Sequence, residues 1–394
     1  MIVRQFLQWV RHAPPGERAE ATSALARAYL HSDLSADDLA AAEGAMIMLL
    51  DDPSPLVRRA LSEIFASAQK APRVVVHALA GDQPDIAMPV LARSPLLMED
   101  DLIDLVAIAH PECQVAIATR AMLPRSLAAA IAEVGSAQAC LALLENSDAD
   151  IAWFSIDRMV ERFGHLAPIR ENLLARDDLP MAMRQALLSK LSRTLAGFVA
   201  ARQWLGSEHA EYAAKEACEK ATVALAADTP YEEIGALVQH LRQSGQLTAG
   251  MILRALLSGN VVLVEEALAE LSGIALERAA SYIHDKNISG FRALYSKAGL
   301  PDLAYPAFRE ALAAMREGVL LGEQGGAARL KRRMVERVLE ACACEPMTDM
   351  ALLALLRRFA VEAAREEARM FCEDLVADDS MPRTVAPLET RLVA

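Results

Sequence analysis

A short polar segment followed by an apolar helical stretch recurs along the first half of this chain. Aligning Leu56, Ile86, Val115, Ile151 and Met181 gives successive steps of 30, 29, 36 and 30 residues. Such a period is typical of stacked helix pairs, in which each pair completes its core against its neighbours. The copies are Asp51-Asp-Pro-Ser-Pro-Leu-Val57, Gly81-Asp-Gln-Pro-Asp-Ile-Ala87, His110-Pro-Glu-Cys-Gln-Val-Ala116, Ser147-Asp-Ala-Asp-Ile-Ala152 and Asp177-Asp-Leu-Pro-Met-Ala182.

The stretch from Pro53 to Ala68 shows why each copy predicts a helix. Its apolar residues recur at steps of three and four, so they share one helix face. Asp52 is a suitable N-cap, and Pro53 suits the first helical position. The chain is 54% hydrophobic but only 5% aromatic, and period-2 alternation is scarce. The sequence therefore predicts an all-α fold, an α-α superhelix.

The stretch Leu49-Leu-Asp-Asp-Pro-Ser-Pro-Leu-Val-Arg-Arg-Ala-Leu61 resembles the turn and second helix of HEAT-like repeats. Together with the text that follows it to Leu105, it resembles an uncharacterised bacterial family known only as a domain of unknown function. The resemblance is strongest over residues 40–110 and extends to about residue 270. It implies a helical solenoid and carries over no catalytic residue.

Four segments are expected along the chain. Residues 1–34 are predicted to form N-terminal capping helices, and residues 35–286 to form the HEAT-like repeats. More frequent glycines from residue 287 onward, and two strong helices at Ala327–Cys344 and Met347–Val376, predict a C-terminal helical domain over 287–376. Residues 377–394 contain two prolines and no periodicity, which predicts a flexible tail.

Charge and hydropathy limit the partners and the compartment. The net charge of −13 makes a protein that coats nucleic-acid phosphates improbable. Mean hydropathy is +0.19, yet no uncharged stretch approaches the length of about 18 to 20 residues that a membrane span needs. The amphipathic start from Ile2 to Val10 is expected to cap the first repeat in preference to lying on a membrane. No secretory signal is apparent, and six dispersed cysteines are typical of reduced thiols, so we expect a cytoplasmic protein.

Residues that could carry chemistry are scattered. The eight histidines lie far apart, and the sequence has no phosphate loop, nucleophile elbow or zinc-ligand pattern. Cys342-Ala-Cys344 lacks the further ligands that a metal site needs. We therefore expect no enzyme activity, no metal and no cofactor.

Two groups of arginines are candidate binding residues. Those on successive repeats would line up along one surface and could hold carboxylates or phosphates, or could form a structural ladder with Asp52, Asp82 and Asp177. Those after the glycines at 322–326 oppose the helix dipole, so an acidic partner, a phosphate, the Asp378-Asp379 tail or solvent could neutralise them. The first group is Arg58, Arg59, Arg93, Arg120, Arg158 and Arg184, and the second is Arg329, Arg332, Arg333 and Arg337.

The hypothesis that fits these patterns best is a non-enzymatic scaffold or adaptor that binds a protein partner of unknown identity. The alternative is a nucleic-acid-binding solenoid similar to HEAT-like DNA glycosylases, which would need a local basic surface. The pathway and the oligomeric state do not follow from these patterns.

Overall fold

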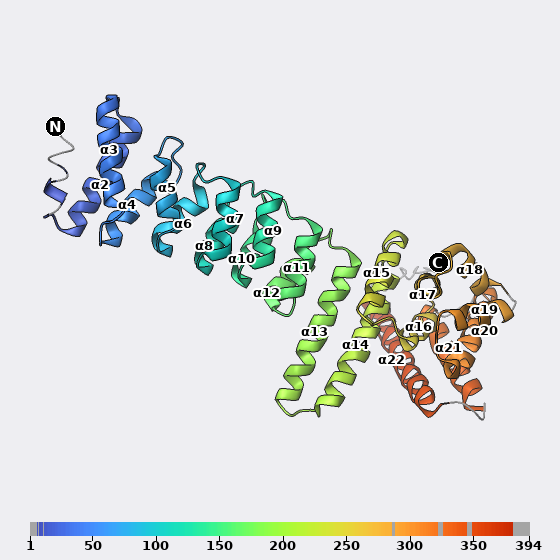
Figure 1. The fold of residues 1–394 in the computed structure, drawn as a ribbon. Coiled ribbons are helices and arrows are strands. Elements are labelled where there is room, and N and C mark those ends of the chain that lie inside the picture. Colours follow the sequence, from blue (N-terminus) through green and yellow to red (C-terminus); the bar gives the residue numbers. More distant parts are fainter. Residues whose placement is uncertain are drawn as a thin grey trace, which may run out of the picture. The chain divides into compact units, whose positions relative to one another are not determined.

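The computed structural model describes residues 6, 8–10, 12–285, 288–321, 326–344 and 349–380. These residues form helices joined by turns and contain no strand, which confirms the predicted all-α helical-repeat fold (Figure 1). The chain divides into two compact units, Met1–Leu179 and Pro180–Ala394.

In the N-terminal unit, the helices form two rows (Figure 1). The even row contains α2 (Pro15–His31), α4 (Pro55–Phe65), α6 (Pro84–Arg93), α8 (Pro111–Ala118), α10 (Ala137–Glu145) and α12 (Ala167–Leu174). The odd row contains α3 (Ala36–Leu49), α5 (Arg73–Ala80), α7 (Glu99–Ile108), α9 (Arg125–Val134) and α11 (Trp153–Phe163). Each helix of the even row packs against the next one in that row.

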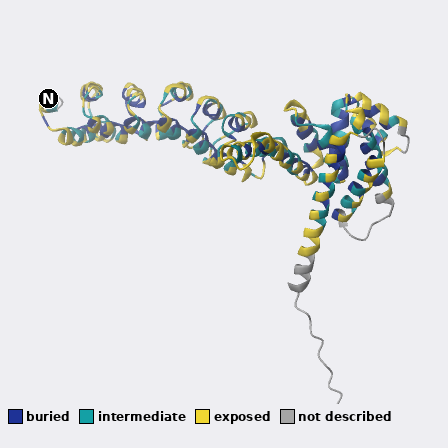
Figure 2. Cartoon of the chain, turned by 90° about the horizontal axis from the view of Figure 1, so that it is seen from below, coloured by how far each residue is buried: buried dark blue, intermediate teal, exposed yellow. Residues whose placement is uncertain are grey.

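Helix α4 illustrates how one apolar face joins the rows. Val57, Leu61 and Phe65 follow at steps of four and are completely buried, whereas Arg59 and Glu63 face solvent. Figure 2 shows the same division along the unit, with buried residues between the helices and exposed residues on the sides that face away. A single pair could not bury these faces, so the stacking supplies the core.

The first turn of α4 differs from the prediction. The helix begins at Pro55 with Ser54 as N-cap, two residues after the expected start. Asp52 accepts a hydrogen bond from the Ser54 backbone N–H at 2.8 Å and also pairs with Arg18. The carboxylate of Asp52 therefore holds the turn before the helix and a neighbouring helix, and does not cap α4.

The repeat register also differs from the prediction after α8. The copy at residues 147–152 precedes α11, which belongs to the odd row, whereas the three earlier copies precede even-row helices. The even-row helix at this place is α10, which starts at Ala137 with Ser136 as N-cap and was missed because its start contains neither Asp nor Pro. The step of 36 residues arises from this change of row.

The C-terminal unit begins with two antiparallel helices of 21 residues each, α13 (Met181–Ala201) and α14 (Ser207–Ala227). Shorter helices follow: α15 (Tyr231–Gln243), α16 (Ala249–Leu257), α17 (Val261–Ser272), α18 (Leu276–His284) and α19 (Ile288–Lys297). A 3-10 turn at Asp302–Ala304 leads into α20 (Tyr305–Leu321), α21 (Gly326–Cys344) and α22 (Met350–Ser380).

The core of this unit surrounds α16, in which every residue from Met251 to Leu257 is buried. One continuous apolar cluster runs from Val223 to Phe359 and includes an aromatic group formed by Phe291, Tyr295, Tyr305 and Phe308. The expected boundary between residues 286 and 287 falls inside this cluster, so the segments on its two sides share one core. The structure instead divides the chain between Leu179 and Pro180.

The two ends of the chain were also predicted differently. Helix α2, placed in a capping segment, is the first member of the even row and packs against α4. Helix α22 continues to Ser380, so the first four residues of the expected tail, 377–380, are helical. The rest of that tail, and most of the segment from Ile2 to Val10, lie outside the described residues.

Candidate functional site

The arginines of the repeats are mostly engaged within the chain. Arg58 forms a bidentate pair with Asp82 at 2.6 and 3.1 Å and donates a third hydrogen bond to the Asp52 carbonyl oxygen. These contacts raise the pKa of Arg58, chiefly through the hydrogen bond to Asp82. Arg59 pairs with Glu63 on its own helix, whereas Arg93 is exposed and Arg184 is half-buried. Arg58 and Asp82 thus form one rung of the structural ladder considered above.

Polar side chains of one repeat also cap the C-termini of helices in the neighbouring repeat. Arg120 donates to the carbonyl oxygens of Leu91 and Ser94, at the end of α6, at 2.5 and 2.7 Å. Asn146 does the same at the end of α8, where it donates to the carbonyl oxygens of Ala118 and Arg120. The last carbonyls of a helix have no partner in that helix, and cations are favoured there. Sequence reasoning missed this pattern, although each group lies just beyond a predicted helix.

The cations of α21 also find partners in the chain. Arg332 pairs with Glu336 at 2.7 Å and with Glu367 of α22 at 2.9 Å, and Lys331 pairs with Glu366 at 2.7 Å. The carboxylates of α22 therefore neutralise Lys331 and Arg332. For the arginines of this helix, an acidic partner, a phosphate, the Asp378-Asp379 tail and solvent were the alternatives. Arg337 pairs with Glu317 of α20. Arg333 is exposed but has an interaction within the chain, and Arg329 is exposed.

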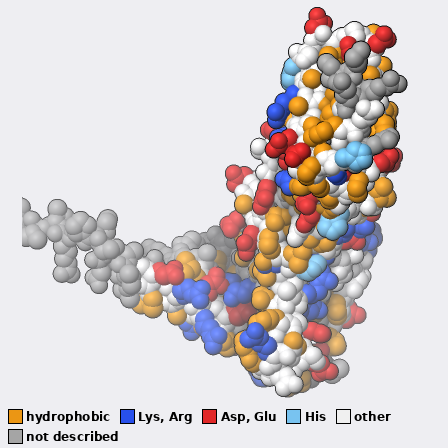
Figure 3. Space-filling view, turned by 90° about the vertical axis from the view of Figure 1, so that its left-hand side faces the viewer, with side chains coloured by type: hydrophobic (Ala, Val, Ile, Leu, Met, Phe, Trp, Pro, Cys, Tyr) orange, Lys and Arg blue, Asp and Glu red, His pale blue; other side chains and the backbone are white. Residues whose placement is uncertain are grey.

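The odd row of the N-terminal unit exposes large apolar side chains at the ends of its helices. Ile108 and Met122 are 83% and 85% exposed, and Phe154 is 63% exposed. Figure 3 shows hydrophobic side chains reaching the surface beside charged ones. Only Leu56 and Leu174 are comparably exposed in the even row. We define the odd-row face by these side chains: Ile47, Met48, Val74, Met98, Ile108, Met122, Val134, Trp153 and Phe154.

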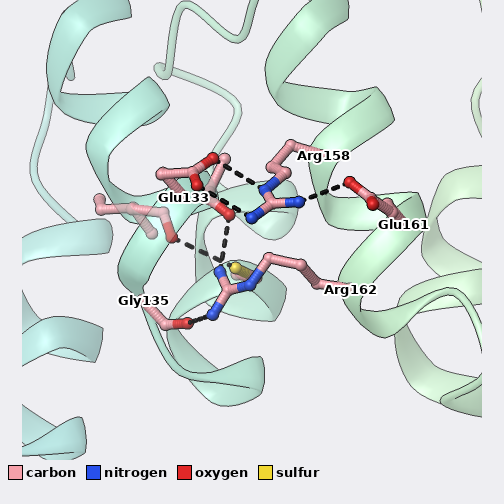
Figure 4. Close-up of polar contacts among 8 residues, drawn as sticks. Glu133, Gly135, Arg158, Glu161 and Arg162 are labelled. Carbon is pink, nitrogen blue, oxygen red and sulfur yellow. Dashed lines mark hydrogen bonds and ion pairs between the residues drawn. The ribbon is translucent and has the colours of Figure 1, made fainter.

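A hollow of about 400 Å³ lies on this row between α9 and α11, and we call it the α9–α11 hollow. Its lining combines small and apolar residues with three carboxylates and one guanidinium. Arg158 forms a bidentate pair with Glu133 at 2.8 and 2.9 Å and donates to Glu161 at 2.5 Å (Figure 4). These hydrogen bonds, first the one to Glu133, raise the pKa of Arg158. The lining residues are Ala129, Ala132, Glu133, Phe154, Ser155, Asp157, Arg158 and Glu161.

The arrangement around the α9–α11 hollow follows from helical spacing. Arg158 and Arg162 are four residues apart in α11, so both lie on the side of the helix toward α9. Arg162 donates to the carbonyl oxygens of Ala132 and Gly135, at the C-terminus of α9, at 2.7 and 2.8 Å (Figure 4). Both guanidinium groups thus link α11 to the end of α9, and that of Arg158 also borders the hollow.

A larger cavity, of about 710 Å³, lies in the C-terminal unit between α13, α14 and the turn after α15. On its wall, Gln246 accepts a hydrogen bond from the buried Gln185 at 2.8 Å and donates one to Ser189 at 3.3 Å. Arg193 and Lys215 also line the cavity and are matched by Glu211 and Glu219. Because these charges balance, the cavity does not select an ion of either sign.

In the described ranges, no three His, Cys, Asp or Glu side chains come together in a way that could hold a metal ion. Within the same ranges, none of the helices combines the length and the apolar character that crossing a bilayer requires.

The stacked rows define an all-α helical-repeat protein. The family model described as "Uncharacterised protein conserved in bacteria (DUF2336)" matches residues 86–347, more than half of the chain, so the protein belongs to this family. The match begins at residue 86, although the resemblance was expected to be strongest over residues 40–110. No curated protein and no solved structure matches the chain.

Proposed function

We propose that this protein is a non-enzymatic, HEAT-like scaffold that binds another protein through the odd-row face. The observation that carries this proposal is the repetition of exposed apolar side chains at helix ends of one row. Single exposed apolar residues are ordinary on protein surfaces, but a contiguous set of them marks interaction sites. Binding of this kind needs neither a metal nor a cofactor.

The repeat architecture supports the proposal because it places equivalent positions in line. Val74, Met98 and Met122 lie at or just before the N-termini of α5, α7 and α9, and Trp153 and Phe154 begin α11. In a stacked array, such positions form an extended surface. The free cysteines support a reducing compartment, and we therefore place the partner in the bacterial cytoplasm.

The alternative, nucleic-acid binding, receives less support from the same surface. Affinity for phosphates needs cations that are free to replace counterions. Arg58, Arg120 and Arg332 are instead occupied by carboxylates or carbonyl oxygens of the chain. Helices α3 and α7 carry carboxylates and no cation.

The test is affinity capture from a bacterial lysate with the full chain and with a triple variant, Val74→Ser, Met122→Ser and Phe154→Ser. We expect the wild-type protein to retain a defined partner that the variant loses. The matched control is the even-row variant Leu56→Ser with Leu174→Ser, which should retain the partner. Circular dichroism melting of all three proteins checks that the fold is unchanged.

Two outcomes would overturn the proposal. One is that the wild-type protein retains nothing beyond the bead blank. The other is that the triple variant and the control retain the same proteins as the wild type. A gel shift of labelled DNA or RNA that weakens with salt would favour the nucleic-acid alternative instead.

A further inference from the structure

We propose that the α9–α11 hollow receives a basic side chain from an amphipathic, basic segment of the partner protein. This inference depends on the proposed function, since it names the chemistry of the partner that the odd-row face would bind. The hollow supplies an aromatic wall, excess negative charge and a hydrogen-bond acceptor without a partner.

The aromatic wall is Phe154, in the first turn of α11, which is 63% exposed. Ala129 and Ala132 line the same hollow from α9, and their short side chains leave the space open. A cation over the face of an aromatic ring is attracted by the ring quadrupole, and its aliphatic stem packs on apolar surface. The space and the ring therefore suit a lysine or arginine side chain.

The charges of the hollow favour a cation as well. Glu133, Asp157 and Glu161 line it together with a single guanidinium, that of Arg158. Arg162 is not among the lining residues, and its donors point away to the carbonyl oxygens at the end of α9 (Figure 4). Arg158 is already fixed between Glu133 and Glu161, and Asp157 is exposed with no ion-pair partner among the described residues.

The independent observation is Ser155. This residue lines the hollow and is only 1% exposed, and its buried Oγ has no hydrogen-bond partner in the structure. Buried polar atoms without partners are uncommon, and leaving one unpaired costs about 1 to 3 kcal/mol. An ammonium or guanidinium group that enters the hollow brings N–H donors and would satisfy this acceptor.

Helix α7, the next helix of the odd row, also carries exposed carboxylates beside an exposed apolar side chain. Asp100, Asp104 and Ile108 follow at steps of four in α7, so they share one exposed face. Neither aspartate has an ion-pair partner in the part of the chain that the structure describes. A segment that alternates basic and apolar residues would complement this face, whereas nucleic acids and anionic lipids would be repelled.

The probe is a synthetic 18-residue peptide of Leu and Lys at amphipathic helical spacing, with a Leu and Glu peptide as its counterpart. The three tryptophans are Trp9, Trp153 and Trp204. In the full chain carrying Trp9→Phe and Trp204→Phe, Trp153 is the sole tryptophan and precedes Phe154 in the chain; its fluorescence, together with the anisotropy of a fluorescein-labelled peptide, is the readout of binding. We expect saturable binding of the Lys peptide and none of the Glu peptide.

Three variants in this background separate the hollow from general charge attraction. Asp157→Asn and Ser155→Ala should each weaken binding of the Lys peptide by about threefold to fivefold, the range expected for one exposed ionic or polar contact. Ser155→Ala should not lower the melting temperature, because it removes an unpaired group. The matched control, Asp85→Asn on the exposed side of the even row, changes the net charge equally and should leave affinity unchanged.

Equal affinity of the Asp157→Asn, Ser155→Ala and Asp85→Asn variants would overturn the inference, and so would equal binding of both peptides. This failure is distinguishable from failure of the proposed function. If lysate capture still depends on Val74, Met122 and Phe154, the scaffold stands and only the basic-segment chemistry is wrong.

Discussion

Arg58 of α4 reaches Asp82, in the turn before α6, and forms two hydrogen bonds to its carboxylate. Their side chains are only 16% and 18% exposed. Arg18 repeats the contact one helix earlier with Asp52, at 2.8 Å. The arginine and the turn aspartate of neighbouring repeats are therefore structural partners in this part of the even row.

We expect Arg58→Met to destabilise the N-terminal unit by about 1 to 3 kcal/mol, because it leaves the half-buried Asp82 carboxylate without its charged donor. Arg59→Met, one residue along, removes only an exposed i,i+4 pair and should cost less than about 0.5 kcal/mol. Urea unfolding followed by the fluorescence of Trp153, with Trp9→Phe and Trp204→Phe, measures both. Equal effects of the two substitutions would show that the Arg58 pair adds nothing.

In the C-terminal unit, Arg254 of α16 is a buried arginine with two carboxylate partners. It is 5% exposed, pairs with Glu362 of α22 at 2.5 Å and with Glu216 of α14 at 3.5 Å, and stacks on Phe359. We expect Arg254→Met to destabilise this unit by about 3 to 5 kcal/mol, because the partly buried Glu362 loses its cation and Glu216 keeps only Arg358, at 3.3 Å.

The measurement is urea unfolding followed by the fluorescence of Trp204, the sole tryptophan of the C-terminal unit, with Trp9→Phe and Trp153→Phe. Arg278→Met on α18 is the control, since Arg278 is exposed and contacts only Tyr282 among the described residues. A change no larger than that of the control would contradict the expected result.

Two glycines should respond in opposite directions to substitution by alanine. Gly44 lies inside α3, and a Cβ there meets nothing within 4 Å, so Gly44→Ala should stabilise the protein by about 0.5 to 1 kcal/mol. At Gly135, the Cβ would lie 2.4 Å from the carbonyl oxygen of Ile131. Gly135→Ala should therefore destabilise it by about 1 to 3 kcal/mol, the usual cost of a steric insertion. Thermal melting of the two variants tests the sign of each effect.

The cysteines should divide by reactivity. Cys344 and Cys372 are exposed, whereas Cys113, Cys140, Cys218 and Cys342 are buried. Burial raises the pKa of Cys140 to about 11, and it also raises those of Cys113 and Cys218. At pH 8 these buried thiols stay protonated and inaccessible. We expect Ellman's reagent to titrate two thiols rapidly in the native protein and all six in denaturant; six rapid thiols in the native protein would contradict this burial.

The sequence was sufficient to predict the fold class but not the exposed surface. Helical periodicity and the residues that start helices are local properties, so α4, α6 and α8 were located within a few residues. Met98 and Met122 look like ordinary core residues in the sequence, since exposure depends on which neighbour covers a side chain. Their positions just outside the amphipathic helices were the available signal.

For the arginines, the sequence supplied the alternatives and the tertiary structure chose between them. The spacing of Arg58 and Asp82 allowed a ladder, and the fold brings their atoms within 2.6 Å. Arg332 has a local partner, Glu336, four residues on, but its second partner, Glu367, lies 35 residues away, on a helix that only packing brings near. The α9–α11 hollow is likewise formed by two helices whose contact no local pattern encodes. Helix formation depends on neighbours along the chain, whereas ion pairs, exposure and hollows depend on neighbours in space.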